Sequence, residues 1–209
     1  MFAWPRIYWR VVRFLRRAPT TPRKLGILAG TFNPPTLAHL ELANAGARYA
    51  DEVLFVVPSV LPHKDYSGAT LDQRLAMIES SGIAMPHSIA TTERGLFIEI
   101  GRECREHYDS GTTVFFLCGR DAAERILKWD YGQPGVVEEM LSEFELLVAP
   151  RLGAFEVPAK FRERIHLLDI AEGHDAVSSS EVRSRIARGE RWEHLVPEMI
   201  VEQVREIYS

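Results

Sequence analysis

Cysteine and long uncharged hydrophobic runs are scarce in this sequence of 209 residues. The two cysteines, Cys104 and Cys118, have neither a metal-ligand nor a CxxC spacing, which argues against a disulfide framework and favours a reducing, cytoplasmic setting. Arginine interrupts the apolar positions near the N-terminus too often for a signal peptide or a spanning helix. Internal repeats and low-complexity tracts are also absent. The length suits one α/β domain with a full core.

Acidic residues are missing from the first 24 positions, which carry seven arginine and lysine side chains. Because the whole chain has a net charge of −4, the rest of the chain carries −11. An acidic body of this kind argues against sequence-independent nucleic-acid binding by the main domain. The sequence therefore divides into a basic amphipathic N-terminal extension with its linker, residues 1–23, and one domain over residues 24–209.

The N-terminal extension predicts an amphipathic helix within residues 1–17. Such a helix can lie on an anionic membrane surface, so peripheral membrane contact is one interpretation. Packing on its own domain or on a partner is another, and a misassigned start codon is a third. The apolar side of the helical wheel holds Trp4, Ile7, Tyr8, Val11, Val12 and Leu15, and the opposite side holds Arg6, Arg10, Arg13 and Arg17.

A candidate phosphate site lies in the stretch that follows this linker. The apolar run Leu25–Ala29 is typical of a buried parallel strand, and Gly30 lets the backbone turn close to a ligand. A helical pattern begins at Thr36, and His39 lies on the same side of its first turn. Free N–H groups and the positive end of the helix dipole favour an anion there. The alternative is an ordinary capped helix with an incidental histidine.

A second helix start rich in hydroxyl groups follows Val177. Ser178, Ser179 and Ser180 stand where free N–H groups bind phosphate oxygens, and Arg183 lies one turn further along on the same side. Arg183 can stabilise negative charge that builds up on a leaving pyrophosphate. A serine-capped helix with an exposed arginine is the alternative.

Strands and helices alternate along the rest of the chain. This order predicts a Rossmann-like, doubly wound parallel sheet, which binds ligands at the carboxyl ends of its strands. The further predicted strands are 52–57, 89–91, 112–118, 144–149 and 165–170. The further predicted helices are 71–81, with a capping box at Thr70, 95–107, a helix that follows Gly119-Arg120-Asp121 and runs through Trp129, and 197–208.

Residues 30–39 resemble the G-x-F-x-P-x-[HT]-x-G-H signature of the HIGH-type nucleotidylyltransferases, with Ala38 in place of the second glycine. Residues 177–183 resemble the I-S-S-T-x-[IV]-R signature of the same superfamily. Two softer similarities point to bacterial nicotinate-nucleotide adenylyltransferases: the Pro62-His63-Lys64 loop and the strand-G-x-D…W arrangement. Residues 95–99 depart from the family, which usually has a Ser-Tyr-Thr-like segment there. The resemblance covers roughly residues 24–208.

This resemblance implies Mg²⁺-dependent transfer of AMP from ATP to nicotinate mononucleotide in NAD biosynthesis. Mg²⁺ would be held mainly by the ATP phosphates, without a protein metal site. The implied catalytic residues are Thr36, His39 and Arg183, the implied ATP-binding residues are Gly30, Thr31, Phe32, Ser178, Ser179 and Ser180, and the implied substrate-binding residues are Lys64, Gly119, Asp121, Trp129 and Arg151.

Several alternatives remain open at the level of the sequence. The acceptor can instead be nicotinamide mononucleotide, phosphopantetheine or a small alcohol phosphate. A nucleotide-binding regulator without turnover and a membrane-recruited scaffold are two further readings. At single positions, Asp121 can simply cap its helix, and Phe97 can stack on a pyridine ring or belong to the core.

Overall fold

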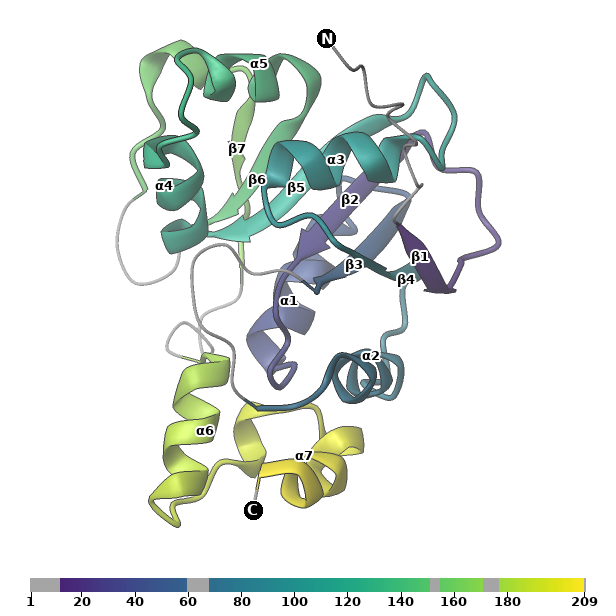
Figure 1. Ribbon diagram of the computed structural model, residues 1–209, viewed down its shortest axis with the longest axis vertical. Helices are drawn as coiled ribbons and strands as arrows, with labels where there is room; N and C mark the ends of the chain where they lie inside the picture. Colours follow the sequence, from purple (N-terminus) through teal and green to yellow (C-terminus); the bar gives the residue numbers. More distant parts are fainter. Residues whose placement is uncertain (1–11, 60–67, 151–154, 171–176, 209) are drawn as a thin grey trace, which may run out of the picture.

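The computed structural model describes residues 12–59, 68–150, 155–170 and 177–208 (Figure 1). Strands and helices alternate through most of this part of the chain. The strands are β1 (Arg13–Arg16), β2 (Lys24–Ala29), β3 (Glu52–Pro58), β4 (His87–Thr92), β5 (Thr113–Gly119), β6 (Glu145–Ala149) and β7 (Ile165–Leu167). The helices are α1 (Leu37–Gly46), α2 (Leu71–Glu79), α3 (Phe97–Arg105), α4 (Arg120–Lys128), α5 (Val136–Glu143), α6 (Ser179–Ala187) and α7 (Val201–Tyr208), with short 3₁₀ turns at Ala159–Phe161, Glu193–Leu195 and Glu198–Ile200.

The strands form one sheet in the order β1-β4-β3-β2-β5-β6-β7. All neighbouring strands from β4 to β7 pair in parallel. The chain starts this parallel part at β2 in the centre, moves outward through β3 and β4, and returns to β5 on the other side of β2. Gly26 of β2 accordingly lies opposite both Val53 of β3 and Phe115 of β5. This is the doubly wound order, with its switch point between β2 and β5, so the predicted fold class is confirmed.

Helices cover both faces of the sheet (Figure 1). One hydrophobic cluster joins the sheet to α3, α4 and α5, and a second joins it to α1 and α2. β5 supplies both clusters by alternation, because Val114 and Phe116 point to one face while Phe115 and Leu117 point to the other. A strand buried on both faces is nearly all apolar, which explains why the sequence pattern predicted β5.

The helices α6 and α7 form a group of their own below the sheet in Figure 1. A third hydrophobic cluster ties them to α2 and to the start of α1, with Met77 and Ala38 packed near Val182, Ile200 and Val204. This packing fixes the N-terminus of α6 relative to the chain that leaves β2. Among the described residues, no helix has the length and hydrophobicity needed to cross a membrane.

The predicted N-terminal helix is wrong over residues 13–16, which form the antiparallel edge strand β1 against β4. The side chains alternate with period two: Phe14 packs beside Tyr108, whereas Leu15 on the opposite side is 50% exposed. The following segment is anchored by the buried carboxylate of Glu52, which accepts hydrogen bonds from the hydroxyl groups of Thr20, Ser88 and Tyr108. The rest of the predicted helix, residues 1–11, lies outside the described residues.

The other predicted elements are confirmed with shifts at their ends. The capping box at Thr70 is present: the Gln73 side chain accepts from Thr70 N at 2.8 Å, and Thr70 Oγ1 accepts from Gln73 N at 3.2 Å. The predicted strand 165–170 is shorter, at Ile165–Leu167, and α5 was not anticipated. α5 begins after Gly135, whose φ of +83° suits glycine, without a capping side chain that would mark its start in the sequence.

Candidate active site

A cavity of about 530 Å³ opens at the carboxyl ends of β2 and β5, the switch point of the sheet. The ends of β2 and β5 form its floor, and the starts of α4 and α6 and one side of α1 form its walls. Its lining residues are Leu28, Ala29, Gly30, His39, Leu42, Phe97, Leu117, Cys118, Gly119, Arg120, Asp121, Ala122, Arg125, Val177 and Ser178.

A smaller cavity of about 140 Å³ lies next to the first and shares part of its wall. Its lining is mainly apolar and aromatic, which suits a flat ring. The residues common to both cavities are Ala29, Gly30, Phe97, Ala122 and Arg125. The remaining lining residues of the smaller cavity are Thr31, Pro58, Gly95, Leu96, Ile100, Ile126, Trp129 and Tyr131.

His39 is held in one orientation by Thr36, the N-cap residue of α1. The Nδ1 atom of His39 lies 3.0 Å from the backbone nitrogen of Thr36 and 2.8 Å from its hydroxyl oxygen. Because a backbone N–H only donates, Nδ1 must accept, and the proton of the neutral ring is on Nε2. Thr36 is fully buried, so its hydroxyl group serves to orient the imidazole. His39 therefore offers an N–H donor in the larger cavity.

The loop after β2 holds a residue in the left-handed region. Phe32 has a φ of +46° and is fully buried, with its ring 5.0 Å from that of His39 and 5.9 Å from that of Phe55. Such a conformation is costly for a residue with a side chain and persists where the surroundings fix it. Gly30 next to it donates its N–H to Val56 O at 3.1 Å. The loop is thus a rigid platform beside the histidine.

Residues from distant parts of the chain pin the carbonyl and amide groups of this loop. The guanidinium of Arg74, a buried residue of α2, donates to Thr31 O at 3.1 Å. The amide oxygen of Asn33, which is also buried, accepts from Ala69 N at 3.2 Å and from the hydroxyl group of Tyr208 at the end of α7. The loop after β2, which is the predicted phosphate loop, therefore depends on α2 and α7 for its shape.

The serine-rich start of α6 docks on the same loop. Ser178 caps α6 by accepting from Glu181 N at 3.1 Å, and it lines the larger cavity. The hydroxyl group of Ser179 donates to Pro34 O at 2.7 Å, and Arg183 donates to Asn33 O at 2.5 Å and to Ser179 O at 3.3 Å. The two sequence signatures therefore meet in space, with the start of α6 beside His39 at the larger cavity.

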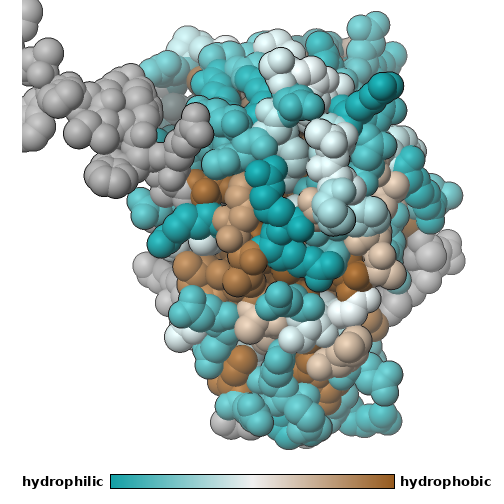
Figure 2. Space-filling view, turned by 90° about the vertical axis from the view of Figure 1, so that its right-hand side faces the viewer, coloured by the Kyte–Doolittle hydropathy of each residue, from teal (hydrophilic) through white to brown (hydrophobic). Residues whose placement is uncertain are grey.

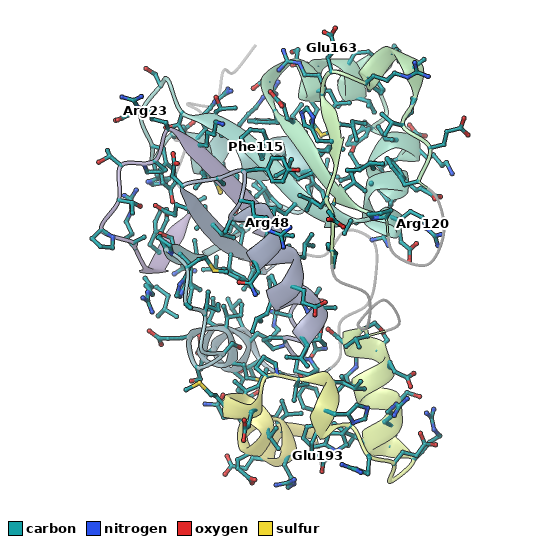
Figure 3. The ribbon with its side chains drawn as sticks, turned by 180° about the vertical axis from the view of Figure 1, so that it is seen from behind. Arg23, Arg48, Phe115, Arg120, Glu163 and Glu193 are labelled. Atoms are coloured by element: carbon teal, nitrogen blue, oxygen red, sulfur yellow. The ribbon has the colours of Figure 1, made fainter. Side chains whose placement is uncertain are left out.

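α4 forms the opposite wall. Gly119 is its N-cap, so the alternative role of Asp121 as a cap is wrong. Asp121 lines the larger cavity, and its side chain is 82% exposed. Its carboxylate oxygen Oδ1 lies 3.4 Å from Nη2 of Arg120, which Figure 3 shows at the lower end of α4. Trp129 ends the helix in the smaller cavity. Arg125 lines both cavities and was missed, although its spacing of three residues from Ala122 and four from Trp129 places all three on one helix face.

Some of the remaining predicted site residues lie outside the part of the chain that the structure describes. Lys64 and Arg151 lie outside the described residues. The ring of Phe97 packs 5.1 Å from that of Phe116, as expected of a core residue. Phe97 also lines both cavities, and its stacking on a pyridine ring stays a prediction. Cys118 lines the larger cavity, and burial raises the pKa of its thiol to about 12, which disfavours the reactive thiolate form. In the described part of the chain, no group of three or more histidine, cysteine or acidic side chains is arranged to hold a metal ion.

Comparison with known proteins agrees with this geometry. A family model described as cytidylyltransferase-like matches residues 27–185. A probable nicotinate-nucleotide adenylyltransferase of Moorella thermoacetica is 29% identical over 205 residues, which cover 89% of this chain and 91% of that protein. A protein of the same name from Solibacter usitatus is 31% identical over 187 residues, which cover 85% of this chain and 94% of that protein.

A solved structure supports the fold. Plasmodium falciparum nicotinic acid mononucleotide adenylyltransferase, complexed with NaAD, superposes with a TM-score of 0.61 and 17% sequence identity. The match covers 88% of this chain and 95% of that chain. At this level of identity the likeness concerns the arrangement of strands and helices.

Proposed function

Because this chain belongs to the cytidylyltransferase-like family of nucleotidyltransferases, we propose that it transfers AMP from ATP to nicotinate mononucleotide. The observation that carries the proposal is the pair of joined cavities at the switch point. The larger cavity has two helix N-termini, His39 and Ser178 for phosphates, and the smaller one has Phe97 and Trp129 for a pyridine ring. Relatives that align with this chain over most of their own length are named probable nicotinate-nucleotide adenylyltransferases.

In the proposed reaction, a phosphate oxygen of the acceptor attacks the α-phosphorus of ATP. The new P–O bond forms in line with the bond to the bridging α–β oxygen, which breaks and leaves with its electron pair on pyrophosphate. The acceptor phosphate is already an anion, so the protein needs no strong base, and catalysis consists of positioning and charge stabilisation. His39 donates its Nε2–H to a phosphate oxygen, and Thr36 keeps the imidazole in the orientation required.

Mg²⁺ fits this site as a companion of the triphosphate. Asp121 is the acidic residue among those that line the larger cavity, and one carboxylate with phosphate oxygens is a usual donor set for Mg²⁺. When bound, the ion neutralises charge on the phosphates. The residues Gly30, Thr31, Ser178 and Asp121 would then surround the loaded nucleotide.

Pyrophosphate release from ATP and Mg²⁺ with each candidate acceptor tests this proposal. We expect release with nicotinate mononucleotide and a fall in kcat of about 10²- to 10³-fold in His39→Ala, as for loss of a donor to a developing charge. His194→Ala, a substitution of an exposed histidine in a 3₁₀ turn, is the matched control. Pyrophosphate release only with nicotinamide mononucleotide or phosphopantetheine would refute nicotinate mononucleotide as the acceptor. ATP binding without pyrophosphate release would favour a nucleotide-binding regulator.

We also propose peripheral contact of the N-terminal extension with an anionic membrane surface, for a protein that otherwise works in the cytoplasm. β1 brings Arg13 and Arg16 to the edge of the sheet next to the exposed Leu15. The side of the molecule shown in Figure 2 carries both hydrophobic and strongly hydrophilic residues. Co-sedimentation with phosphatidylserine vesicles tests this, comparing the full chain with Arg13→Glu/Arg16→Glu. If neither protein sediments at low salt, the membrane contact is refuted.

A further inference from the structure

Arg125 lies where the two cavities of the candidate active site meet. Along α4, Asp121 lines only the larger cavity, Arg125 lines both, and Trp129 lines only the smaller one. Four helical residues rise about 6 Å, so Arg125 is roughly one turn from each of the other two. The helix thus runs from the phosphate side of the site to its aromatic side, with Arg125 at the passage between them.

The guanidinium of Arg125 is uncommitted within the described part of the chain. Its charged neighbours on α4 are paired, Arg120 with Asp121 at 3.4 Å and Lys128 with Glu124 at 3.1 Å, whereas Arg125 has no hydrogen bond or ion pair with a described residue. Among the described residues that line the smaller cavity, Arg125 is the one charged side chain. A guanidinium in this situation is suited to a bidentate contact with an anion.

We propose that Arg125 binds the phosphate group of the acceptor mononucleotide and so positions the nucleophile. This inference rests on the proposed function, in which the acceptor ring occupies the smaller cavity between Phe97 and Trp129. The phosphate of such an acceptor must cross the shared wall to reach the α-phosphorus of ATP beside His39. At that crossing it lies against Arg125, whose charge offsets the repulsion between the acceptor phosphate and the triphosphate.

Binding measurements separate the phosphate contact from the rest of the acceptor. Calorimetry with α,β-methylene ATP present compares nicotinate mononucleotide with nicotinate riboside, which has the same ring and sugar without the phosphate. In Arg125→Ala, we expect the preference for the mononucleotide over the riboside to fall about 10- to 100-fold, as for loss of a charge-assisted hydrogen bond. The affinity for the riboside should change less than about threefold, and Arg125→Lys should recover part of the preference.

Lys128→Ala is the matched control, because Lys128 is a basic residue of the same helix that lines neither cavity of the site. An equal loss of affinity for both ligands in Arg125→Ala would overturn the proposal. So would a lower melting temperature with an unchanged preference, since this would mean that Arg125 only interacts with the helix dipole in the last turn of α4. Pyrophosphate release by the wild type reports separately on the proposed function: turnover of nicotinate mononucleotide with an unchanged preference in Arg125→Ala refutes the role of Arg125 alone.

Discussion

Replacing Thr36 with valine tests whether this residue acts on the reaction through His39. Valine keeps the shape of the buried threonine side chain and removes its hydroxyl group, which lies 2.8 Å from His39 Nδ1. The backbone N–H of residue 36 still donates to Nδ1, at 3.0 Å in the wild type. Thr36→Val therefore loosens the imidazole without releasing it.

The expected loss of stability follows from two contributions of this hydroxyl group. One neutral hydrogen bond contributes about 0.5–1.5 kcal/mol, and an apolar residue at an N-cap costs about 0.5–2 kcal/mol. Because the two overlap in one hydroxyl group, we expect a total of about 1–2 kcal/mol. For a chain of this length, that lowers the melting temperature by about 2–8 °C. Differential scanning calorimetry measures this change.

The expected loss of activity is smaller than that of His39→Ala. Since one of two contacts to Nδ1 remains, we expect kcat/KM for ATP to fall about 3- to 10-fold in the pyrophosphate assay, where a tenfold change corresponds to about 1.4 kcal/mol. Thr36→Ser keeps the hydroxyl group, so we expect near-normal kcat/KM together with a stability loss of about 1 kcal/mol for one buried methyl group. A loss of 100-fold or more in Thr36→Val with an unchanged melting temperature would refute the reasoning, because the hydroxyl group would then contact the triphosphate directly.

Two further predictions concern groups away from the cavities. Burial lowers the pKa of His87 below its usual value near 6.5, so the unfolded chain binds the proton more readily than the folded chain. The free energy of unfolding should therefore fall by up to about 1.4 kcal/mol per pH unit as the pH drops below 6.5. Melting curves between pH 5 and 8 should show this slope, and His87→Asn should flatten it. A slope that persists in His87→Asn would show that another group causes it. Tyr208→Phe removes the hydrogen bond to Asn33 and should raise KM for ATP a few-fold with little change in KM for the acceptor. Tyr49→Phe, at an exposed tyrosine, is its control, and equal effects of the two substitutions would contradict a role in the phosphate loop.

The sequence predicted those parts of the fold whose signals are local. β2, Gly30 and the cap at Thr36 carry a strand pattern, a turn residue and a helix start within a dozen positions, and the structure has each in place. The edge strand β1 was misread because its four residues, Arg-Phe-Leu-Arg, are too few to establish a two-residue period against the helical pattern of the preceding residues. Its true conformation depends on pairing with β4, a contact between residues about 75 positions apart, such as Arg13 with Thr91.

The candidate site was predictable to the extent that its residues belong to motifs. His39, Ser178 and Trp129 line the cavities as the motifs suggest, whereas Arg125 belongs to no motif and becomes relevant only where α4 meets the end of β2. Residues 95–97 depart from the Ser-Tyr-Thr-like segment of the family and still line the smaller cavity. The packing of α3 on the sheet, and not the identity of these residues, brings them there. Motifs therefore point to single residues of the two cavities, whereas packing determines the rest of their lining.

The contacts of the second signature change its physical interpretation. Ser179 and Arg183 donate to the carbonyl oxygens of Pro34 and Asn33, so in this structure they bind the first signature. These carbonyl groups belong to the Asn33–Pro34 and Pro34–Pro35 peptide bonds, which have no N–H, so the contacts fix the path of the backbone that leads into α1. The spacing of 150 residues between Arg183 and Asn33 is bridged only because the C-terminal helices pack on α2 and the start of α1. The C-terminal helices therefore hold in place the loop after β2, to which the proposed function assigns phosphate binding.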